Sequence, residues 1–452
     1  MSGQISKHSV SERLVARLQG PVGDDDRSAA ALRFVDWLGC ALAGAASPTG
    51  RRFLGQSAPP GEASRISRMA TSAEAAAFAN GALGNVLEMD DVDKRATLHP
   101  GPSVIPAALA LAEETGASGA ALLDAIVVGY EATIRVGRAV GPGHYRFWHN
   151  TGTCGPYGAA AACARLLGLD EAATADALGL AGTAAGGLWQ TRHEPNSAAK
   201  QLHTAKAAQA GLQAARLAQS GLGGPRAIFE GPQGVFAAMC PGANPEDILP
   251  VPGTPWAVHE TSFKPWPACR HAHAAIDAAL AVRASLTLDA VESVQVLTYP
   301  DAITFCDRPV PETVLQAKFS LQHAVSVVLL RGEPRLADFE PEAFDAEVVR
   351  ALAKKVSVGE GEPFTSAYPA RYGAKLDIVL KDGRLISETA ADAWGDPENP
   401  MSEADIIAKA AMLGTEGAGL EPKPVNDAIH AALALPYASD LTGLKAAFDA
   451  LR

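Results

Sequence analysis

The first half of the chain reads almost entirely as helix. From Arg27 to about Met239, apolar residues recur at the three- to four-residue spacing of amphipathic helices, and no strand-like alternation interrupts them. Alanine and glycine are abundant here, whereas aromatic residues make up only 6% of the chain. Small side chains let helices approach one another closely, so this half predicts a large and tightly packed helical domain.

Three stretches define the expected helices most clearly. Residues 72–91 form a helix pattern that ends in acidic residues. Residues 121–141 are apolar on most faces, which indicates a central buried helix. A further helix is expected over residues 103–116, with Ser103 as its N-cap.

The pattern changes beyond residue 240. Residues 241–258 are rich in proline and glycine and predict a linker. Residues 291–299 then have strand propensity, and two short apolar runs on either side of Asp382 and Gly383 predict a hairpin. Helix patterns flank these strands, which together indicate an α+β unit.

The last part of the chain returns to helix. Ser402 and Asp405 fit the N-cap and N3 positions of a capping box. The expected fold is therefore mainly α. A large all-helical domain is built from residues 1–260 and 396–452, and a smaller α+β lid domain is built from residues 261–395.

Charge and cysteine content exclude several classes of protein. The chain has 38 Lys and Arg against 50 Asp and Glu, a formal net charge of −12, which argues against nucleic acid as a partner. None of the six cysteines forms a CxxC pair, so no zinc cluster is expected. Residues 1–18 lack the apolar core of a signal peptide, and no uncharged apolar stretch reaches the roughly 18–20 residues of a membrane span. We expect a soluble cytoplasmic protein with reduced thiols and no membrane partner.

Two clusters of titratable residues precede residue 160. The first runs from Glu88 to His99, where acids at a helix end are followed by a histidine in a loop of proline and glycine. The second covers residues 143–153, where Tyr145 and His149 precede a helix start rich in glycine and threonine. The free N–H groups of such a start suit an anionic group.

Two further clusters follow. Lys200 and His203 share one face of an alanine-rich helix. The fourth cluster begins just before two prolines and ends in a helix start, and it contains Lys264, Cys269, Arg270, His271 and His273. A cysteine at a helix start can have a lowered pKa and act as an acid or base.

Each cluster also has a purely structural explanation. The acids before His99 would form a solvated helix end, and Asn150 or Thr151 would cap the helix of the second cluster. In the third cluster, Lys200 would have a buried stem and an ammonium group in solvent. In the fourth, Cys269 would be buried and inert. Taken together, acids, bases and cations without a metal pattern, phosphate loop or nucleophile elbow suit proton abstraction next to a carboxylate. Two other classes stay open: a Mg²⁺-dependent helical enzyme using Asp90 and Asp93, and a catalytically inactive helical scaffold.

As a set, these motifs resemble the MmgE/PrpD family, which includes 2-methylcitrate dehydratase, cis-aconitate decarboxylase and iminodisuccinate epimerase. The resemblance covers nearly the whole chain, and each motif alone is weak. Besides the acidic segment that ends at His99, the strings that carry it are FVDWLGCALAG, GYEATIRVGRAVG, HNTGTCGPYGAAAACARLLGL, AAKQLHTAKAA, FKPWPACRHAHAAIDA, AKFSLQHAVSVVLLRG and GDPENPMSEADI.

The resemblance implies an all-helical domain with an α+β lid, usually assembled as a homodimer. It also implies that no metal or organic cofactor is used and that the active site lies between the domains. Positions that line the family's active site are matched by His99, His149, Lys200 and Lys264.

Four positions differ from the decarboxylase branch of the family: Glu88 (Asp there), Val92 (Thr), Cys269 (His) and His323 (Tyr). The segment before His99 is also one residue longer. The epimerase branch resembles this chain at Cys269 and in the GHY…WH pattern that ends at His149.

The expected function is that of a cofactor-free lyase or isomerase that abstracts a proton α to a carboxylate of a small di- or tricarboxylate. Dehydratase, decarboxylase and epimerase chemistry all stay open. The expected catalytic residues are Lys200, His149, His99, Cys269 and Tyr145. The expected substrate-binding residues are Lys264, Arg270, His203, Glu88, His271 and His323.

Overall fold

The computed structural model describes residues 8–194 and 197–452. The chain divides into two compact units: unit 1 contains residues up to Thr261 and from Ser402 onward, and unit 2 contains Ser262–Met401. Of residues 1–18, which the sequence predicts to be no signal peptide, the first seven lie outside the described part. The mainly α-helical fold predicted from the sequence is confirmed.

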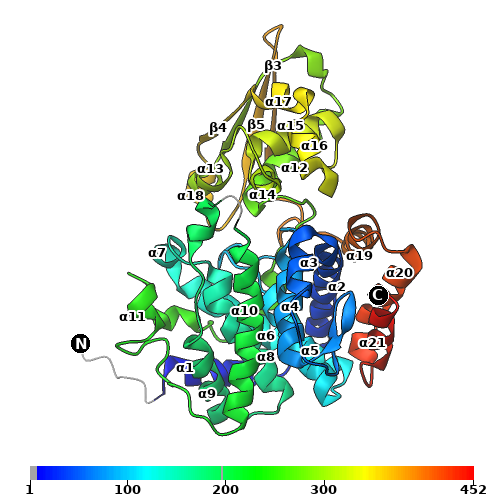
Figure 1. Ribbon diagram of the computed structural model, residues 1–452. Helices are drawn as coiled ribbons and strands as arrows, with labels where there is room; N and C mark the ends of the chain where they lie inside the picture. The colour runs from blue at the N-terminus through cyan, green and yellow to red at the C-terminus, as the bar shows by residue number, and fades with distance from the viewer. Residues whose placement is uncertain (1–7, 195–196) are drawn as a thin grey trace, which may run out of the picture. The chain divides into compact units, whose positions relative to one another are not determined.

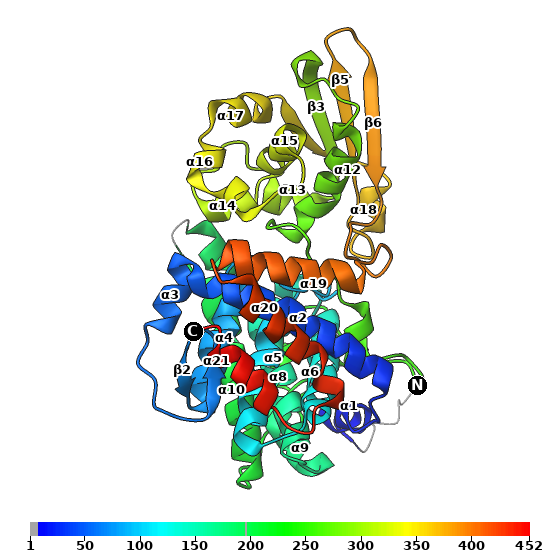
Figure 2. The same cartoon turned by 90° about the vertical axis from the view of Figure 1, so that its right-hand side faces the viewer.

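Unit 1 is built almost wholly of helices, which pack side by side around α6 and α8 (Figures 1 and 2). Its α-helices are α1 (Val10–Leu18), α2 (Asp24–Ala46), α3 (Pro48–Leu54), α4 (Ala73–Asn85), α5 (Gly101–Thr115), α6 (Gly119–Ala139), α7 (Gly141–Tyr145), α8 (Asn150–Leu166), α9 (Glu171–Gly182), α10 (Ala199–Gln219), α11 (Val235–Met239), α19 (Glu403–Met412), α20 (Pro422–Leu433) and α21 (Thr442–Asp449). Short 3₁₀ turns lie at Trp189–His193, Pro245–Ile248, Ala257–Glu260 and Leu435–Tyr437, and a π-helical turn lies at Leu413–Gly417.

Small residues let these helices pack at short range. A Cβ atom added to Gly129 of α6 would lie 2.8 Å from the carbonyl oxygen of Gly158 in α8. One added to Gly211 of α10 would lie 2.4 Å from the Cβ of Ala159. The abundance of alanine and glycine therefore has the packing role expected from the sequence, and α6 is the buried central helix.

Helix α2 is long and apolar enough to cross a membrane by length and composition. However, 89% of its most apolar 18-residue window is buried inside the protein. Phe34 and Trp37 are fully enclosed and meet edge to face. A Cβ at Gly39 would lie 2.7 Å from the Cα of Ala410 in α19. Helix α2 is thus a core helix, and the C-terminal helices α19 and α20 pack against it.

Three sequence-based expectations for unit 1 are wrong. The helix expected over residues 72–91 ends at Asn85, so the acids after it stand on irregular backbone. The helix expected from Ser103 begins at Gly101, and the Ser103 hydroxyl donates back to the Pro100 carbonyl instead of capping. Two short antiparallel strands, β1 (Ala63–Arg65) and β2 (Arg68–Thr71), also interrupt the helices. Strands this short carry too few alternating residues to give a pattern.

The predicted linker over residues 241–258 is also wrong. The segment belongs to unit 1 and packs on its helices. Ile248 is fully buried, and the indole N–H of Trp256 donates to the Pro21 carbonyl over 3.2 Å. The backbone N–H of Ala257 donates to the carboxylate of Glu131 on α6 over 2.7 Å. Proline and glycine mark irregular backbone here without marking a break between the units.

Unit 2 is an α+β unit with one four-stranded sheet. Its strands are β3 (Val291–Thr298), β4 (Val356–Glu360), β5 (Ala374–Leu380) and β6 (Leu385–Ala390), in the order β4-β3-β5-β6. The β3–β4 pair is parallel and the other pairs are antiparallel. The predicted strand at residues 291–299 and the predicted hairpin are confirmed, and Gly383 has the positive φ of 87° that its turn requires.

Helices cover one face of this sheet, where α12 and α15 pack against it (Figure 2). The helices of unit 2 are α12 (His273–Arg283), α13 (Pro300–Cys306), α14 (Val314–Lys318), α15 (Leu321–Arg331), α16 (Pro341–Phe344), α17 (Glu347–Ala353) and α18 (Phe364–Ala367). The inward residues Val294 and Val296 of β3 meet Ile276 of α12 and Val325 of α15 in one apolar core. The capping box predicted for Ser402 and Asp405 follows this unit and is confirmed.

Candidate functional site

The candidate site in unit 1 is organised by the irregular segment between α4 and α5. Glu88 in this segment has a φ of 60°, in the left-handed region that residues other than glycine rarely adopt. Its side chain is buried, and both carboxylate oxygens lie 2.5 Å from the Nζ of Lys200 at the start of α10. The strained backbone thus holds the carboxylate of Glu88 against Lys200, which the sequence predicts to be catalytic.

The next acids of the segment are buried and bonded separately. Asp90 accepts hydrogen bonds from the amide of Asn85 at 3.0 and 3.1 Å, and one of its oxygens lies 2.8 Å from the Nδ1 of His99. Asp91 accepts from the backbone N–H of Gly101 over 3.0 Å. Burial, followed by the nearby charge of Asp36, raises the pKa of Asp91 to about 7. The Asp90 contact fixes the ring of His99, as a carboxylate partner does in many catalytic histidines.

Two histidines from distant segments meet in the same unit. His149 is the N-cap residue of α8, and its Nδ1 lies 3.2 Å from the Nδ1 of His203 on α10. Its ring also packs on Trp189, with centroids 4.6 Å apart, and lies 6.4 Å from the ring of His99. Because one Nδ1 must donate to the other, the two imidazoles hold complementary tautomers.

Burial and a neighbouring cation keep these imidazoles neutral. Burial and then the charge of Lys200 lower the pKa of His149 well below its usual value. The same two causes, in the same order, lower the pKa of His203 to about 4. Near neutral pH, the site therefore contains proton acceptors beside a lysine that is held by a carboxylate.

The loop that carries His99 is tied to the first turn of α8. The Thr151 hydroxyl accepts from the backbone N–H of His99 over 3.0 Å, and the Asn150 amide donates to the Ala96 carbonyl over 2.7 Å. Capping of α8 by Asn150 or Thr151 is therefore wrong, since the N-cap is His149 without a side-chain cap bond. These polar side chains hold the two histidine segments together instead.

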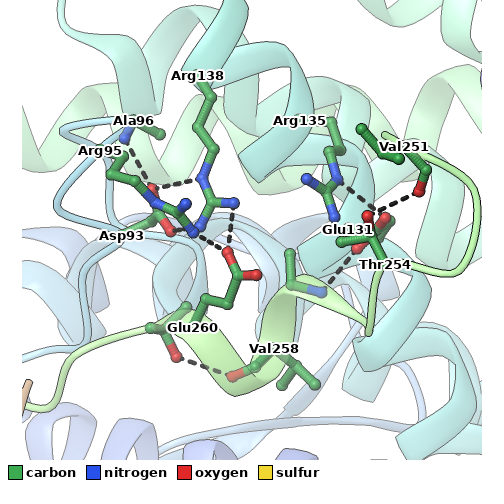
Figure 3. Close-up of polar contacts among 12 residues, drawn as sticks. Asp93, Arg95, Ala96, Glu131, Arg135, Arg138, Val251, Thr254, Val258 and Glu260 are labelled. Carbon is green, nitrogen blue, oxygen red and sulfur yellow. Dashed lines mark hydrogen bonds and ion pairs between the residues drawn. The ribbon is translucent and has the colours of Figure 1, made fainter. Parts of the chain in front are cut away.

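A partly buried ionic network also anchors this loop (Figure 3). Asp93 accepts from the backbone N–H of Ala96 over 2.7 Å and from the Nε of Arg138 over 3.1 Å, with a second contact to the same guanidinium. Arg138 also reaches Glu260 over 2.5 Å, and Arg95 pairs with Glu260. Helix α6, the His99 loop and the segment that leads out of unit 1 are thus connected through one set of charges.

The carboxylates of Asp90 and Asp93 serve different contacts. The first is engaged with Asn85 and His99, and the second with Arg138. A Mg²⁺ site would require carboxylate oxygens that converge on one point. The ion pair of Asp93 with an arginine therefore gives no support to the Mg²⁺-dependent alternative.

The chain matches the MmgE/PrpD N-terminal domain over residues 21–248 and the MmgE/PrpD C-terminal domain over residues 266–435. It belongs to the MmgE/PrpD family. It is 30% identical over 348 residues to a cis-aconitate decarboxylase of Mus musculus, covering 73% of this chain and 70% of that one. It is 27% identical to a cis-aconitate decarboxylase-like protein of Aspergillus oryzae, over 76% of each chain. A cis-aconitate decarboxylase of Aspergillus terreus is 26% identical over 91% of this chain and 89% of its own.

Unit 2 of this MmgE/PrpD protein carries the other expected residues. Lys264 is fully buried, and Arg270 is buried in an ion pair with Asp396. Cys269 is the N-cap of a 3₁₀ turn, and its backbone N–H donates to the Lys318 carbonyl over 2.8 Å. The oxygens of Asp392, Asp396 and Glu398 lie within 4.8 Å of one another. Within this acidic group, Asp396 pairs with Arg270 and Asp392 pairs with Arg371.

The histidines of unit 2 lie among its packed residues. The Nδ1 of His271 is 2.8 Å from the Tyr299 hydroxyl, and its ring is stacked between Phe305 and Tyr372. Burial lowers the pKa of His271 to about 4. The Nε2 of His323 contacts the Asp338 carbonyl over 2.7 Å. These contacts favour a packing role for both histidines in addition to the substrate contacts expected from the sequence.

One residue beside the candidate site, Trp189, was not predicted from the sequence. Trp189 packs on His149 and meets the ring of Tyr145 edge to face, with centroids 5.6 Å apart. Two residues before it lies Gly187, whose φ of 138° excludes most side chains and whose added Cβ would lie 3.1 Å from the ring of His203. A tryptophan that follows a glycine pair after one intervening leucine was the available signal for this position.

Proposed function

We propose that this chain is a cofactor-independent lyase that acts on a small tricarboxylate, with decarboxylation of cis-aconitate as the first reaction to test. The observation that carries the proposal is the arrangement in unit 1, where Lys200, paired with Glu88, stands beside two imidazoles with lowered pKa values. The cis-aconitate decarboxylases among its relatives support the choice of substrate.

The roles follow from charge and proton chemistry. The ammonium groups of Lys200 and Lys264 bind substrate carboxylates and stabilise negative charge on an enolate. In decarboxylation, the bond to the departing carboxylate breaks, CO₂ leaves, and its electron pair is held as the enolate. The enolate carbon then takes a proton. His149 or His99 supplies this proton, because a neutral imidazole takes up a proton from solvent and its conjugate acid passes it to carbon.

An epimerase is the second candidate. Its specific support is Tyr145, whose ring meets Trp189 edge to face, since the same tryptophan also packs on His149. A phenol and an imidazole on one aromatic residue suit two-base proton transfer, with Cys269 as a further acid or base. For either reaction we propose a cytoplasmic homodimer that uses no metal.

The test is turnover of a panel of acids: cis-aconitate, methylcitrate, citrate, malate-type acids and iminodisuccinate. Lys200→Ala and His149→Ala are each expected to lower kcat/KM for the true substrate by roughly 10²-fold or more, in the range seen for loss of a positioned acid, base or charge. The matched control is Lys423→Ala, an exposed lysine on α20. Unchanged turnover in both site variants would remove the site assignment.

A further inference from the structure

Unit 1 contains a cavity of about 690 Å³ that lies apart from the residues assigned above. It is formed by α3, α4, the start and middle of α10, and the loop after α3, elements that Figure 1 shows close together. Its size falls within the range of cavities that bind small molecules, about 300–1,000 Å³.

Positively charged side chains line the cavity, and no carboxylate among its described lining residues balances their charge. Arg52, Arg65 and Lys206 line it, and none of the described residues around it is acidic. Within residues 8–194 and 197–452, none of these three cations makes an ion pair, and the buried Nε of Arg65 has no hydrogen-bond acceptor. Burial and then the neighbouring Arg68 lower the pKa of Arg65, as expected for a cation without a counter-charge. In a protein of net charge −12, this concentration of positive charge favours an anionic ligand.

The rest of the lining is aromatic or small. The rings of Phe53 and Phe78 have centroids 5.9 Å apart at an angle of 53°, and the Nζ of Lys206 lies 5.4 Å over the ring of Phe78. Ala79 and Ala199 add short side chains that leave the space open. Aromatic faces next to cations suit a ligand with a planar ring and a charged group.

Helix α10 presents this cavity and the candidate active site on different faces. Ala199, Leu202, Lys206 and Gln209 recur every three to four residues and form one stripe along the cavity. Lys200 is turned by 100° from Ala199 along the helix, in the direction away from this stripe. A ligand in the cavity would therefore not occupy the position of the Lys200 ammonium.

We propose that this cavity binds a nucleoside polyphosphate. Its phosphates would contact Arg52, Arg65 and Lys206, and its base would pack on Phe53 and Phe78. Arginine provides the planar, multiple donors that phosphate oxygens prefer. The site stands on its own contacts and does not depend on the proposed lyase activity.

The test is isothermal titration of the full-length chain with ATP, tripolyphosphate and adenosine. We expect saturable ATP binding that weakens as salt is raised. Adenosine lacks the charge and tripolyphosphate lacks the ring, so each is expected to bind at least about tenfold more weakly, the equivalent of roughly 1.4 kcal/mol. Equal affinity for ATP and tripolyphosphate would overturn the proposed role of the aromatic rings.

The variants locate the site. The double variant Arg52→Gln, Lys206→Gln changes two exposed side chains, so the fold is expected to be retained, as circular dichroism would verify. It should weaken ATP binding at least about tenfold, the equivalent of roughly 1.4 kcal/mol, whereas Lys423→Gln on α20 should leave ATP binding unchanged. Overturning results are no saturable binding at millimolar ATP, full binding in the double variant, or an equal loss in the Lys423 control. Self-association that covers the cavity and blocks ATP would also overturn the proposal.

Discussion

Both carboxylate oxygens of Glu88 lie 2.5 Å from the Nζ of Lys200, across 112 residues of sequence. The pair is buried, and Glu88 adopts a left-handed backbone conformation to form it. A strained residue that retains a buried ion pair is typical of a site whose geometry matters more than local stability. Several outcomes depend on this pair and its neighbours.

Replacing Glu88 by Gln should destabilise the protein, because it leaves the Lys200 ammonium buried beside a neutral group. Loss of one partner of a buried pair costs on the order of 3–5 kcal/mol. We expect a lower urea midpoint by circular dichroism, with Glu171→Gln, an exposed glutamate at the start of α9, as the control. The double variant Glu88→Gln, Lys200→Met buries no charge and should be more stable than the single variant. A double variant that is less stable would contradict this account.

Removing the charge of Lys200 should raise the pKa values of its histidine neighbours. The lysine lowers the pKa of His149 and His203, second only to burial. In Lys200→Met, NMR titration should show both pKa values move upward toward 6.5. His271 in unit 2 is the internal reference, since its lowered pKa arises chiefly from burial. Unshifted titrations of both unit 1 histidines would show that Lys200 does not act on them.

The same histidines give stability a defined pH dependence. When the pKa of a histidine is lower in the folded state, the unfolded state takes up the proton at a higher pH than the folded state does. The free energy of unfolding is therefore not reduced by this histidine above its unfolded pKa of about 6.5. For His203, it is reduced progressively as the pH falls from that value toward the folded pKa of about 4. The variant His203→Gln should show a shallower fall of stability between pH 6.5 and 4, measured from urea midpoints. A slope unchanged from that of the parent chain would contradict the lowered pKa.

Asp91 should act with the opposite sign. Its folded pKa is raised to about 7, mainly by burial, so the folded state holds the proton that the unfolded state releases above about 3.9. Ionisation of Asp91 thus costs stability as pH rises from about 4 to 7. Asn is neutral throughout and can still accept from the Gly101 N–H. In Asp91→Asn, the melting temperature relative to the parent should rise from pH 5 to pH 8. A constant or falling difference would be contrary to this expectation.

Arg138 should position the His99 loop. It binds Asp93 within that loop and Glu260 in the segment leading out of unit 1. In Arg138→Met, hydrogen exchange of residues 93–99 should accelerate and kcat should fall, while Arg138→Lys should partly restore both. Arg226→Met changes an ion-paired arginine elsewhere in unit 1 and serves as the control. Equal exchange in the two methionine variants would remove the positioning role.

The sequence indicated the helical body because apolar periodicity is a local property. It also located the hairpin at Gly383 and the cap at Ser402, where one or two residues determine the geometry. It did not indicate that Glu88 pairs with Lys200 or that His149 meets His203, since these partners come from separate segments. Trp189 was missed for the same reason. The linker error at residues 241–258 arose because composition identifies irregular backbone but not what it packs on.

The most direct measurement is NMR of the EDTA-treated protein with cis-aconitate in D₂O. The proposed mechanism predicts release of CO₂ and a product that carries one solvent deuterium on carbon, because the enolate takes its proton from an exchangeable side chain. Lys200→Ala should slow the appearance of both signals by roughly 10²-fold or more. Deuterium incorporation without loss of CO₂ or water would indicate an isomerase instead. Activity that EDTA abolishes, or no exchange and no turnover with any acid of the panel, would contradict the cofactor-independent lyase.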